Sequence, residues 1–377
     1  MTTPVDAPPY APAPSAGPRP RRPRGAWSLS RRGVWTVAQL ELRQRVRSTR
    51  WIVSLVVFAV VVGGVTFLTW AMADADHSYL SEPQTGRVMF GFIVFFVLFL
   101  GMLVSPTLSA TAINGDRAAG TLATLQITLL SAAEIVLGKL LAAWLASLAF
   151  LAVSLPFVIW SFAAGGTPPL ALLTTLLLLA VMLAVVCAIG LGWSAITART
   201  AGSAVLTYVT VAGLSVLSLI VFGLSASLVS GEEEVEVYGE VEVYDGENYS
   251  YECEHREESR YVAHTERTWW LLAVNPFVIV ADAMPVDVDD EDQYYGAFDP
   301  MSGIKTGVRA AREGVQEPLD ECWSDGDDSW TFDPDDKSPV WPWGLGADLL
   351  LGAGAVWLAV RRLEIPQRSL AKGTRVA

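Results

Sequence analysis

Charged side chains are scarce in this chain of 377 residues. Only 17% of the residues are charged, whereas 52% are hydrophobic and the mean hydropathy is +0.39. A soluble chain of this length usually carries charge on about a quarter of its residues. The scarcity of charge argues against an ordinary soluble protein and predicts one that is embedded in a membrane.

Basic residues are nearly missing from the segment that holds most of the acids. Residues 230–340 contain 30 of the 39 acidic residues but only 7 of the 26 Lys and Arg residues, so the remainder of the chain is net basic. No basic groove-binding pattern appears, and we expect no nucleic-acid partner. An acidic segment and a net basic remainder in one chain indicate that the two parts lie in different compartments.

Motifs that carry catalytic chemistry are also missing. The sequence has no G-x-x-x-x-G-K-[ST] phosphate loop, no Gly-x-Ser-x-Gly elbow and no H-E-x-x-H helix. Its three histidines, His77, His255 and His264, lack metal-ligand spacing, and we interpret them as solvated loop residues. We therefore predict that the chain is not an enzyme and holds no cofactor or metal ion of its own.

Long apolar runs are abundant. About 20 apolar residues cross ~30 Å of hydrocarbon, and six segments qualify: residues 51–72, 89–113, 140–164, 169–197, 204–229 and 341–360. Their interiors hold one ionisable residue, Asp348, interpreted as a snorkelling or cavity-facing acid, with a role in a substrate path as the alternative. The lack of other intramembrane charges argues against an ion-coupled transporter.

Lys and Arg residues collect at the ends of the spans and predict their orientation. Six arginines within residues 31–50 stand directly ahead of the first span, and five basic residues follow the last: Arg31, Arg32, Arg43, Arg45, Arg47 and Arg50, then Arg361, Arg362, Arg368, Lys372 and Arg375. Both ends are expected in the cytosol, so the number of crossings must be even. The expected fold class is an all-α integral membrane protein with six transmembrane helices, cytosolic termini and a large acidic extracellular loop.

These patterns divide the chain into five parts: a Pro/Arg-rich tail expected to be disordered (1–32), a membrane part (33–229), the acidic loop (230–340), the last span (341–360) and a basic cytosolic tail (361–377). Residues 268–285 within the acidic loop are apolar. A seventh span there would place the C-terminal bases outside, so we expect a helix pair or re-entrant hairpin at the outer interface.

The acidic loop carries two cysteines and one alternating segment. Cys253 and Cys322 fall on the oxidising side of the membrane, where disulfides persist, so we predict a bridge between them. Cys187 lies in the fourth span and is interpreted as a small apolar residue. Residues 235–244 alternate apolar and acidic side chains, as in a half-exposed strand or a hairpin around Gly239, which predicts some β structure.

Residues 114–139, between the second and third spans, carry the most specific pattern. Three leucines at helical spacing predict a short amphipathic helix along the membrane surface: Leu122, Leu125 and Leu129. Gly120 allows the chain to turn before it, and Ser131 with Glu134 forms a capping box that starts the next helix. From these residues alone, a membrane-anchoring elbow and a partner-docking helix are equally good interpretations.

This segment resembles the signature of the permeases of type-2 ABC exporters, roughly E-R-E-x-G-T-L-E-x-L-L-x-T-P-L-S-x-x-E-I-x-x-G-K. The matching positions are Asp116, Arg117, Gly120, Thr121, Leu122, Thr128, Leu130, Ser131, Glu134, Ile135, Gly138 and Lys139, whereas Ala118 and Leu129 depart from it. Residues 34–48 are similar to the N-terminal connecting helix of such permeases. Asn275, Pro276 and Asp282 fall in a segment similar to an outer-loop element of bacterial members.

The resemblance implies the membrane permease subunit of an ATP-driven exporter in a bacterial cell membrane, and the composition is compatible with an actinobacterium. A separate ATP-binding subunit, which holds ATP and Mg, would dock beneath residues 114–139, and a second permease copy or paralogue would complete a dimer among the membrane lipids. The residues implied in coupling are Asp116, Arg117, Gly120, Thr121, Leu122, Leu125, Ser131, Glu134, Gly138 and Lys139. Asp116, Arg117 and Glu134 are expected as polar contacts, and Leu122 and Leu125 as packing anchors. The alternative is a non-transporting membrane scaffold or sensor that acts through its acidic loop.

Overall fold

The computed structural model describes residues 25–75, 82–122, 130–244, 249–284, 299–322 and 338–364. Six helical segments among them are long and apolar enough to cross a membrane: Thr49–Met72, Thr85–Ala118, Ala132–Ala164, Pro169–Ile196, Thr200–Ala226 and Trp341–Leu363. They coincide with the six predicted spans, so the expected fold class is confirmed. Most of both predicted tails and His77 lie outside the described residues.

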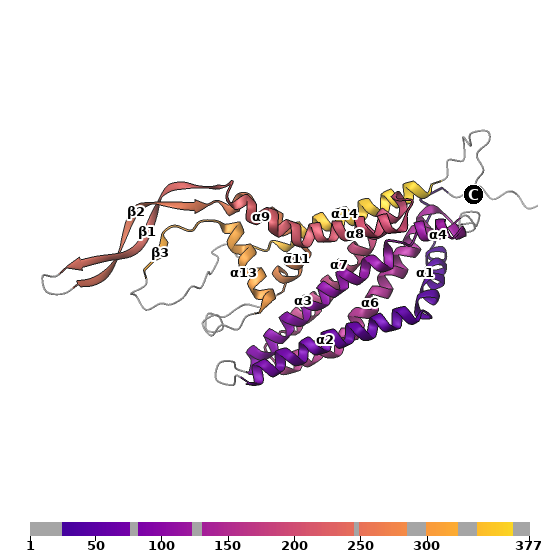
Figure 1. Cartoon of the computed structure of the whole chain (residues 1–377), viewed down its shortest axis with the longest axis horizontal. Coiled ribbons are helices and arrows are strands. Elements are labelled where there is room, and N and C mark those ends of the chain that lie inside the picture. The colour runs from indigo at the N-terminus through magenta and orange to yellow at the C-terminus, as the bar shows by residue number, and fades with distance from the viewer. Residues whose placement is uncertain are drawn as a thin grey trace, which may run out of the picture.

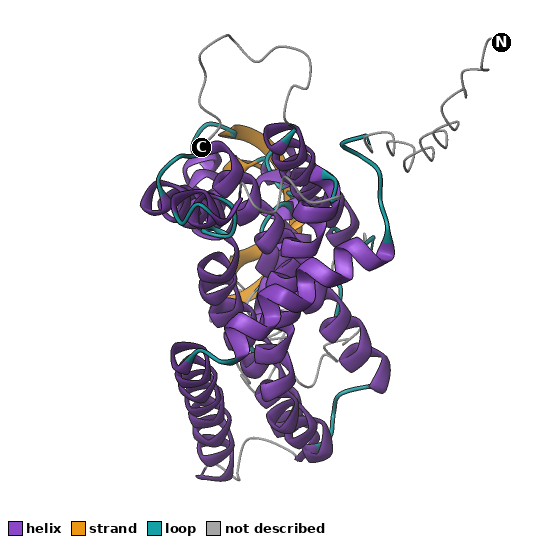
Figure 2. Cartoon of the chain, turned by 90° about the vertical axis from the view of Figure 1, so that its right-hand side faces the viewer, coloured by secondary structure: helices purple, strands orange, loops and turns teal. Residues whose placement is uncertain are grey.

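The spans run back and forth along one bundle, whereas the first helix does not (Figure 1). The spans are α2 (Thr49–Ala75), α3 (Glu82–Ser109) continued by α4 (Asn114–Ala118), α6 (Ala132–Ala164), α7 (Pro169–Ile196), a fifth run described below and α14 (Trp341–Leu363). Helix α1 (Arg31–Val46) crosses one end of this bundle (Figure 2). The C-terminal end of α14 lies at the same end (Figure 1), as an even number of crossings requires.

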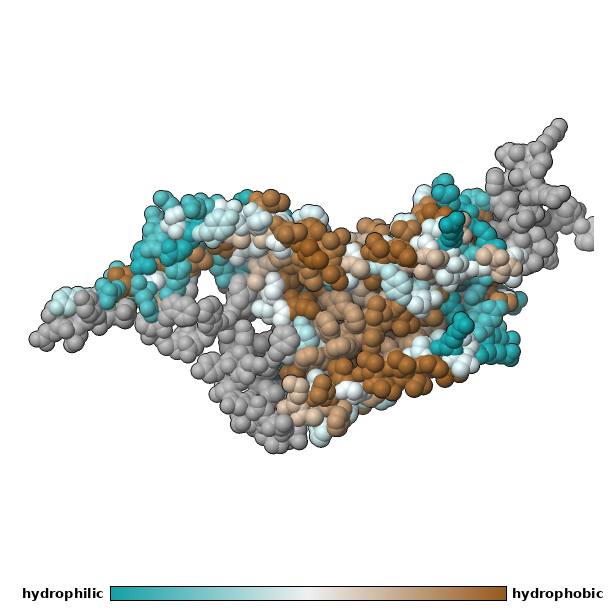
Figure 3. All heavy atoms as spheres, in the orientation of Figure 1, coloured by the Kyte–Doolittle hydropathy of each residue, from teal (hydrophilic) through white to brown (hydrophobic). Residues whose placement is uncertain are grey.

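Three of the spans form most of the core of the bundle. Large side chains of α3, α6 and α7 are fully buried in it, among them Ile93, Phe150 and Met182. The spans α2 and α8–α9 are mostly exposed, with 17% of their apolar windows buried. The face in Figure 3 shows an apolar band over the bundle and hydrophilic residues at both ends, the distribution that a bilayer requires.

The fifth span is a continuous helix with a wider turn in its middle. It comprises α8 (Thr200–Ala212), the π-helical η1 (Gly213–Leu217) and α9 (Ser218–Ala226). A π-turn takes backbone groups out of the regular α-helical ladder. Asn275 Nδ2 binds there, donating to the Ser215 carbonyl oxygen at 2.8 Å and to Ser218 Oγ at 3.1 Å.

Between the fifth and sixth spans the chain forms a domain outside the bundle. Strands β1 (Ser230–Tyr244) and β2 (Tyr249–Ala263) make a long antiparallel hairpin, and β3 (Leu319–Glu321) lies parallel to β1 on its other edge. The predicted hairpin around Gly239 is wrong, because β1 continues through Gly239, which pairs with Glu254 inside the ladder. The apolar and acidic alternation is that of one unbroken strand with a buried and a solvated face.

Two covalent or ionic links hold β3 to the hairpin. Cys253 and Cys322 form a disulfide with a Cα–Cα distance of 5.9 Å. Arg260 of β2 donates from Nε and Nη2 to the two carboxylate oxygens of Glu321, at 3.0 and 2.9 Å. These hydrogen bonds lower the pKa of Glu321. The short strand β3 is therefore held to the hairpin by the side chain of Glu321 and by the disulfide of the residue that follows it.

The apolar segment of the acidic loop forms a pair of short helices. After a 3-10 turn, η2 (Thr265–Arg267), come α10 (Trp270–Ala273) and α11 (Pro276–Asp282), and α11 is buried against α14 and α13 (Pro300–Glu313). Helix α13 was not predicted from the sequence. Its signal was present, because Asp299 followed by Pro300 is a typical N-cap and first helical position.

Candidate functional site

The predicted coupling segment begins as a continuation of the second span. Helix α4 follows α3, and the chain then turns at Gly120, whose φ of +73° favours glycine. Leu122 is buried in an apolar cluster with residues of α6, α7 and α14, so it packs within this chain rather than awaiting a partner. Residues 123–129 lie outside the described residues, and with them Leu125 and most of the predicted amphipathic helix.

Asn114, the first residue of α4, connects the second span to the turn between the fourth and fifth. It is fully buried, and its Nδ2 donates to Ser203 Oγ at 2.7 Å and to the Arg199 carbonyl oxygen at 3.3 Å. Ser194 Oγ donates to Asn114 Oδ1 at 3.1 Å and accepts from the Ile113 amide at 3.0 Å. Displacement of α4 would therefore be transmitted to α7 and α8.

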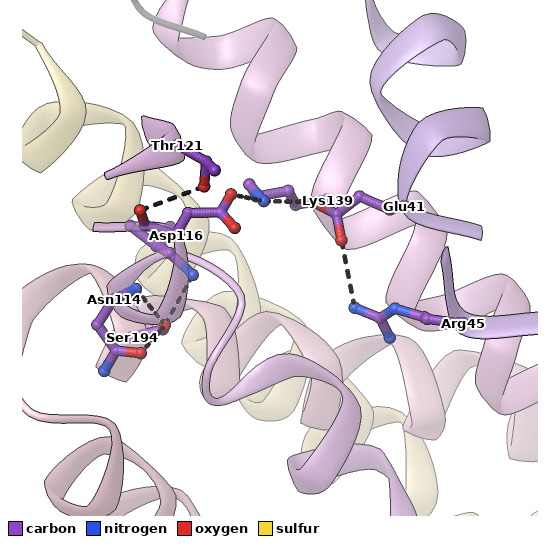
Figure 4. Close-up of polar contacts among 8 residues, drawn as sticks. Glu41, Arg45, Asn114, Asp116, Thr121, Lys139 and Ser194 are labelled. Atoms are coloured by element: carbon purple, nitrogen blue, oxygen red, sulfur yellow. Dashed lines mark hydrogen bonds and ion pairs between the residues drawn. The ribbon is translucent and has the colours of Figure 1, made fainter. Parts of the chain in front are cut away.

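Lys139 lies at the centre of an ion cluster that joins three elements (Figure 4). Its side chain comes from α6 and is fully buried, and its Nζ contacts Asp116 Oδ2 of α4 at 2.5 Å and Glu41 Oε1 of α1. The two carboxylates are partly buried, with side-chain exposures of 28% for Asp116 and 13% for Glu41. A buried ammonium needs such partners, because an unpaired charge inside a protein is costly.

Arg45 extends this cluster on the α1 side. Its guanidinium lies 4.0 Å from the second oxygen of Glu41 and is mostly buried. Burial lowers the pKa of the Arg45 guanidinium, and the charge of Glu41 partly offsets that effect. From the sequence, Arg45 was named only among the bases that predict the orientation of the spans, and Glu41 was not named. The available signal was Glu41 itself, the sole acid among the six arginines of residues 31–50.

Ser131 and Glu134 form the predicted capping box, which is confirmed. Ser131 Oγ accepts from the Glu134 amide at 3.1 Å, and Glu134 Oε2 accepts from the Ser131 amide at 2.9 Å. The Glu134 carboxylate is fully buried beneath Gly33 of α1, where a Cβ would meet Glu134 Cδ at 2.7 Å. The expected direct contact between Glu134 and a partner subunit is therefore corrected: this carboxylate starts α6 and supports α1.

Gly138 allows α1 to approach α6. A Cβ at this position would meet Val37 Cβ at 2.6 Å and the Val34 carbonyl oxygen at 2.9 Å. The signature residues Glu134, Gly138 and Lys139 thus share one role within the chain, because all three hold α1 against the start of α6. Among the described signature residues of the segment, Arg117, Gly120 and Thr121 are exposed, and Asp116 is partly exposed.

At the opposite end of the bundle, Asp282 joins α11 to two other helices. Its Oδ1 accepts from Arg309 Nε of α13 at 2.7 Å, and its Oδ2 accepts from the amides of Val340 and Trp341 at 2.6 and 2.8 Å. Asp282 therefore caps the start of α14 while it pairs with α13. Asn275 caps α11 from its other end by accepting from the Phe277 amide at 2.9 Å, with Pro276 as the first helical residue.

Asp348 is buried inside the bundle rather than at its surface. It is 2% exposed, and its Oδ2 has no hydrogen-bond partner within the described ranges. Because the carboxylate is enclosed within the chain, the burial favours the cavity-facing interpretation over the snorkelling one. A role in a substrate path stays a prediction. Among the described residues, no group of three or more His, Cys, Asp or Glu side chains is arranged to hold a metal ion.

Comparison with known proteins shows the family to which most of this chain is similar. The model of a family described as "ABC-2 family transporter protein" matches residues 35–279, which include α1, the first five spans and the coupling segment. A search of curated proteins finds no match.

Proposed function

This chain belongs to the ABC-2 family of transporter proteins, and from that premise we propose that it couples a separate ATP-binding subunit to the export of a substrate across the cell membrane. Membership of the family makes the chain the membrane permease of an ABC transporter. The ATP-driven partner, the outward direction and a second permease in a dimer are parts of the proposal. ATP and Mg would be held by the partner, since the chain has no phosphate loop of its own.

The observation that carries the proposal is the ion cluster around Lys139. It connects α4 to both α1 and α6, while Asn114 connects α4 to α7 and α8. A subunit that pushes on the exposed residues of the segment would therefore act on four helices through short polar contacts. Buried polar contacts of this kind transmit a displacement because the alternative, an unpaired charge or amide, is costly.

Site-specific photocrosslinking tests the docking surface. A photoreactive amino acid in place of Arg117, expressed in the native host, should capture a protein that contains a nucleotide-binding phosphate loop. The matched control places the same probe at Arg199, an exposed residue of the other turn at this end of the bundle. Failure to capture an ATP-binding protein from position 117, or equal capture from position 199, would contradict docking at the coupling segment.

The second measurement titrates the captured subunit against the reconstituted permease and follows the ATPase rate. The concentration that gives half of the full effect on that rate reports the strength of docking. Arg117→Glu reverses the charge of an exposed side chain, so we expect it to weaken docking at least tenfold if Arg117 makes a charge-assisted contact. The permease variant should remain folded, because the side chain of Arg117 is exposed. Unchanged docking in Arg117→Glu would remove this residue from the coupling surface.

A further inference from the structure

Helix α1 has one face that the bundle does not cover. Its inner face packs on α6 through Gly33, Val37 and Ala38, which are buried. Its outer face carries a groove of about 310 Å³ lined by side chains of α1 itself: Trp35, Gln39, Leu42, Arg43, Val46 and Arg47. Trp35 and Val46 are 54% and 52% exposed, so this face carries apolar side chains that the bundle does not cover.

The outer face of α1 is strongly basic. The only acid in residues 31–50 is Glu41, and it is turned inward onto Lys139 together with Arg45. The five other arginines of this range are left exposed: Arg31, Arg32, Arg43, Arg47 and Arg50. In the described part of the chain, Arg43 and Arg47 form no ion pair. The face therefore combines uncompensated positive charge with exposed apolar side chains.

The position of α1 places this face at the depth of the lipid headgroups. Only Arg47 and Ser48 separate α1 from α2, whose apolar side chains are exposed from its first turns onward. Val53, Val57 and Val60 are 53%, 55% and 67% exposed and form a lipid-facing surface of this span. Since α1 crosses the end of the bundle where α2 begins (Figures 1 and 2), the helix lies along the membrane surface.

We propose that the groove on α1 binds the headgroup of an anionic phospholipid. Arg43 and Arg47 lie one turn apart and pair with the phosphate, for which guanidinium groups have the matching donor geometry. Trp35 and Val46 contact the upper acyl chain, as amphipathic and apolar side chains do at a membrane interface. A lipid fits better than an acidic protein surface because the groove combines arginines with exposed apolar side chains, and α1 is followed after two residues by α2 with its exposed apolar side chains.

The inference does not rest on an ATP-binding partner, and its test is separate. The chain carries benzoylphenylalanine in place of Gln39 and is reconstituted in vesicles of equal parts phosphatidylglycerol and phosphatidylethanolamine. After irradiation, mass spectrometry measures the ratio of the two lipid adducts. The control places the same probe at Val57, which faces the same leaflet but lies outside the groove, and reports the bulk ratio.

We expect the anionic adduct to be enriched roughly fivefold at position 39 relative to position 57, the size expected for one basic residue near an anionic surface. In Arg43→Gln/Arg47→Gln the enrichment should disappear while the Val57 ratio stays the same. Equal ratios at the two positions in the unaltered chain, or enrichment that survives the double substitution, would overturn the proposal. In cells, an adduct to a protein in place of lipid would overturn it too and assign the face to protein docking.

Discussion

At the scale of single residues, the most consequential side chain is Lys139. It is buried between two carboxylates that come from elements 98 and 23 residues away in the sequence. Isolated ion pairs at a surface contribute about 0–1 kcal/mol, whereas removal of one partner from a buried pair costs about 3–5 kcal/mol. Because Asp116 is partly exposed, we expect the contribution of this cluster to the free energy of unfolding to lie between these two values.

We expect Lys139→Met to lower the thermal unfolding temperature of the purified protein, because it leaves Glu41 and Asp116 close together without the ammonium group between them. Adding Glu41→Gln to Lys139→Met should recover part of the loss, since it removes one of the two repelling charges. Unfolding in detergent, followed by the fluorescence of the chain's tryptophans, measures both. If Lys139→Met unfolded at the temperature of the unaltered protein, the cluster would contribute nothing to stability.

At the scale of elements, the packing of α1 on α6 depends on a glycine. Gly138→Ala introduces a Cβ at 2.6 Å from Val37 Cβ and 2.9 Å from a backbone oxygen, so α1 must move away. We expect protease sites in α1 to be cleaved faster in this variant. Gly202→Ala in α8 is the control, because no atom lies within 4 Å of its Cβ position. Equal cleavage of the two variants would contradict close packing at Gly138.

The junction of α11, α13 and α14 depends in the same way on Asp282. Asp282→Ala removes the cap of α14 and leaves Arg309 without its carboxylate, so we expect a loss of about 3–5 kcal/mol. Asp282→Asn should cost less, because an amide oxygen still accepts from the Val340 and Trp341 amides. Thermal unfolding compares them, with Glu242→Ala on the exposed side of β1 as the control. A cost for Asp282→Ala no greater than for the control would refute the role of this junction.

At the scale of the whole molecule, six spans separate a basic end from an acidic domain. The orientation predicted from Lys and Arg places α1 and the coupling segment in the cytosol and the β1–β2 hairpin outside. A membrane-impermeant maleimide should label Glu242→Cys on intact cells, and should label Arg117→Cys only after permeabilisation. Cys187 is buried and should not react in either state. Labelling of position 117 from outside would invert the orientation and remove the basis for docking an ATP-binding subunit there.

Much of this architecture followed from the sequence alone. The six spans and the capping box of Ser131 and Glu134 were predicted, because each depends on a local run of apolar residues or on spacing within one turn. For residues 268–285 the sequence left a helix pair and a re-entrant hairpin as alternatives, and the structure has two short helices there. Gly239 and α13 show the limits of such patterns. An alternation of side chains does not tell where a strand ends, and the helical signal of α13 was obscured by the acidic sequence around it.

The tertiary structure alone decided which polar residues meet. Span helices are apolar on every side, so hydropathy does not tell which face is turned toward the bundle. The meeting of Glu41, Asp116 and Lys139, the burial of Glu134 and the exposed groove on α1 depend on how α1 crosses the bundle end. That crossing is set by packing between helices distant in sequence, because its ion pairs and close glycine contacts join α1 to residues of α4 and α6 that lie far along the chain.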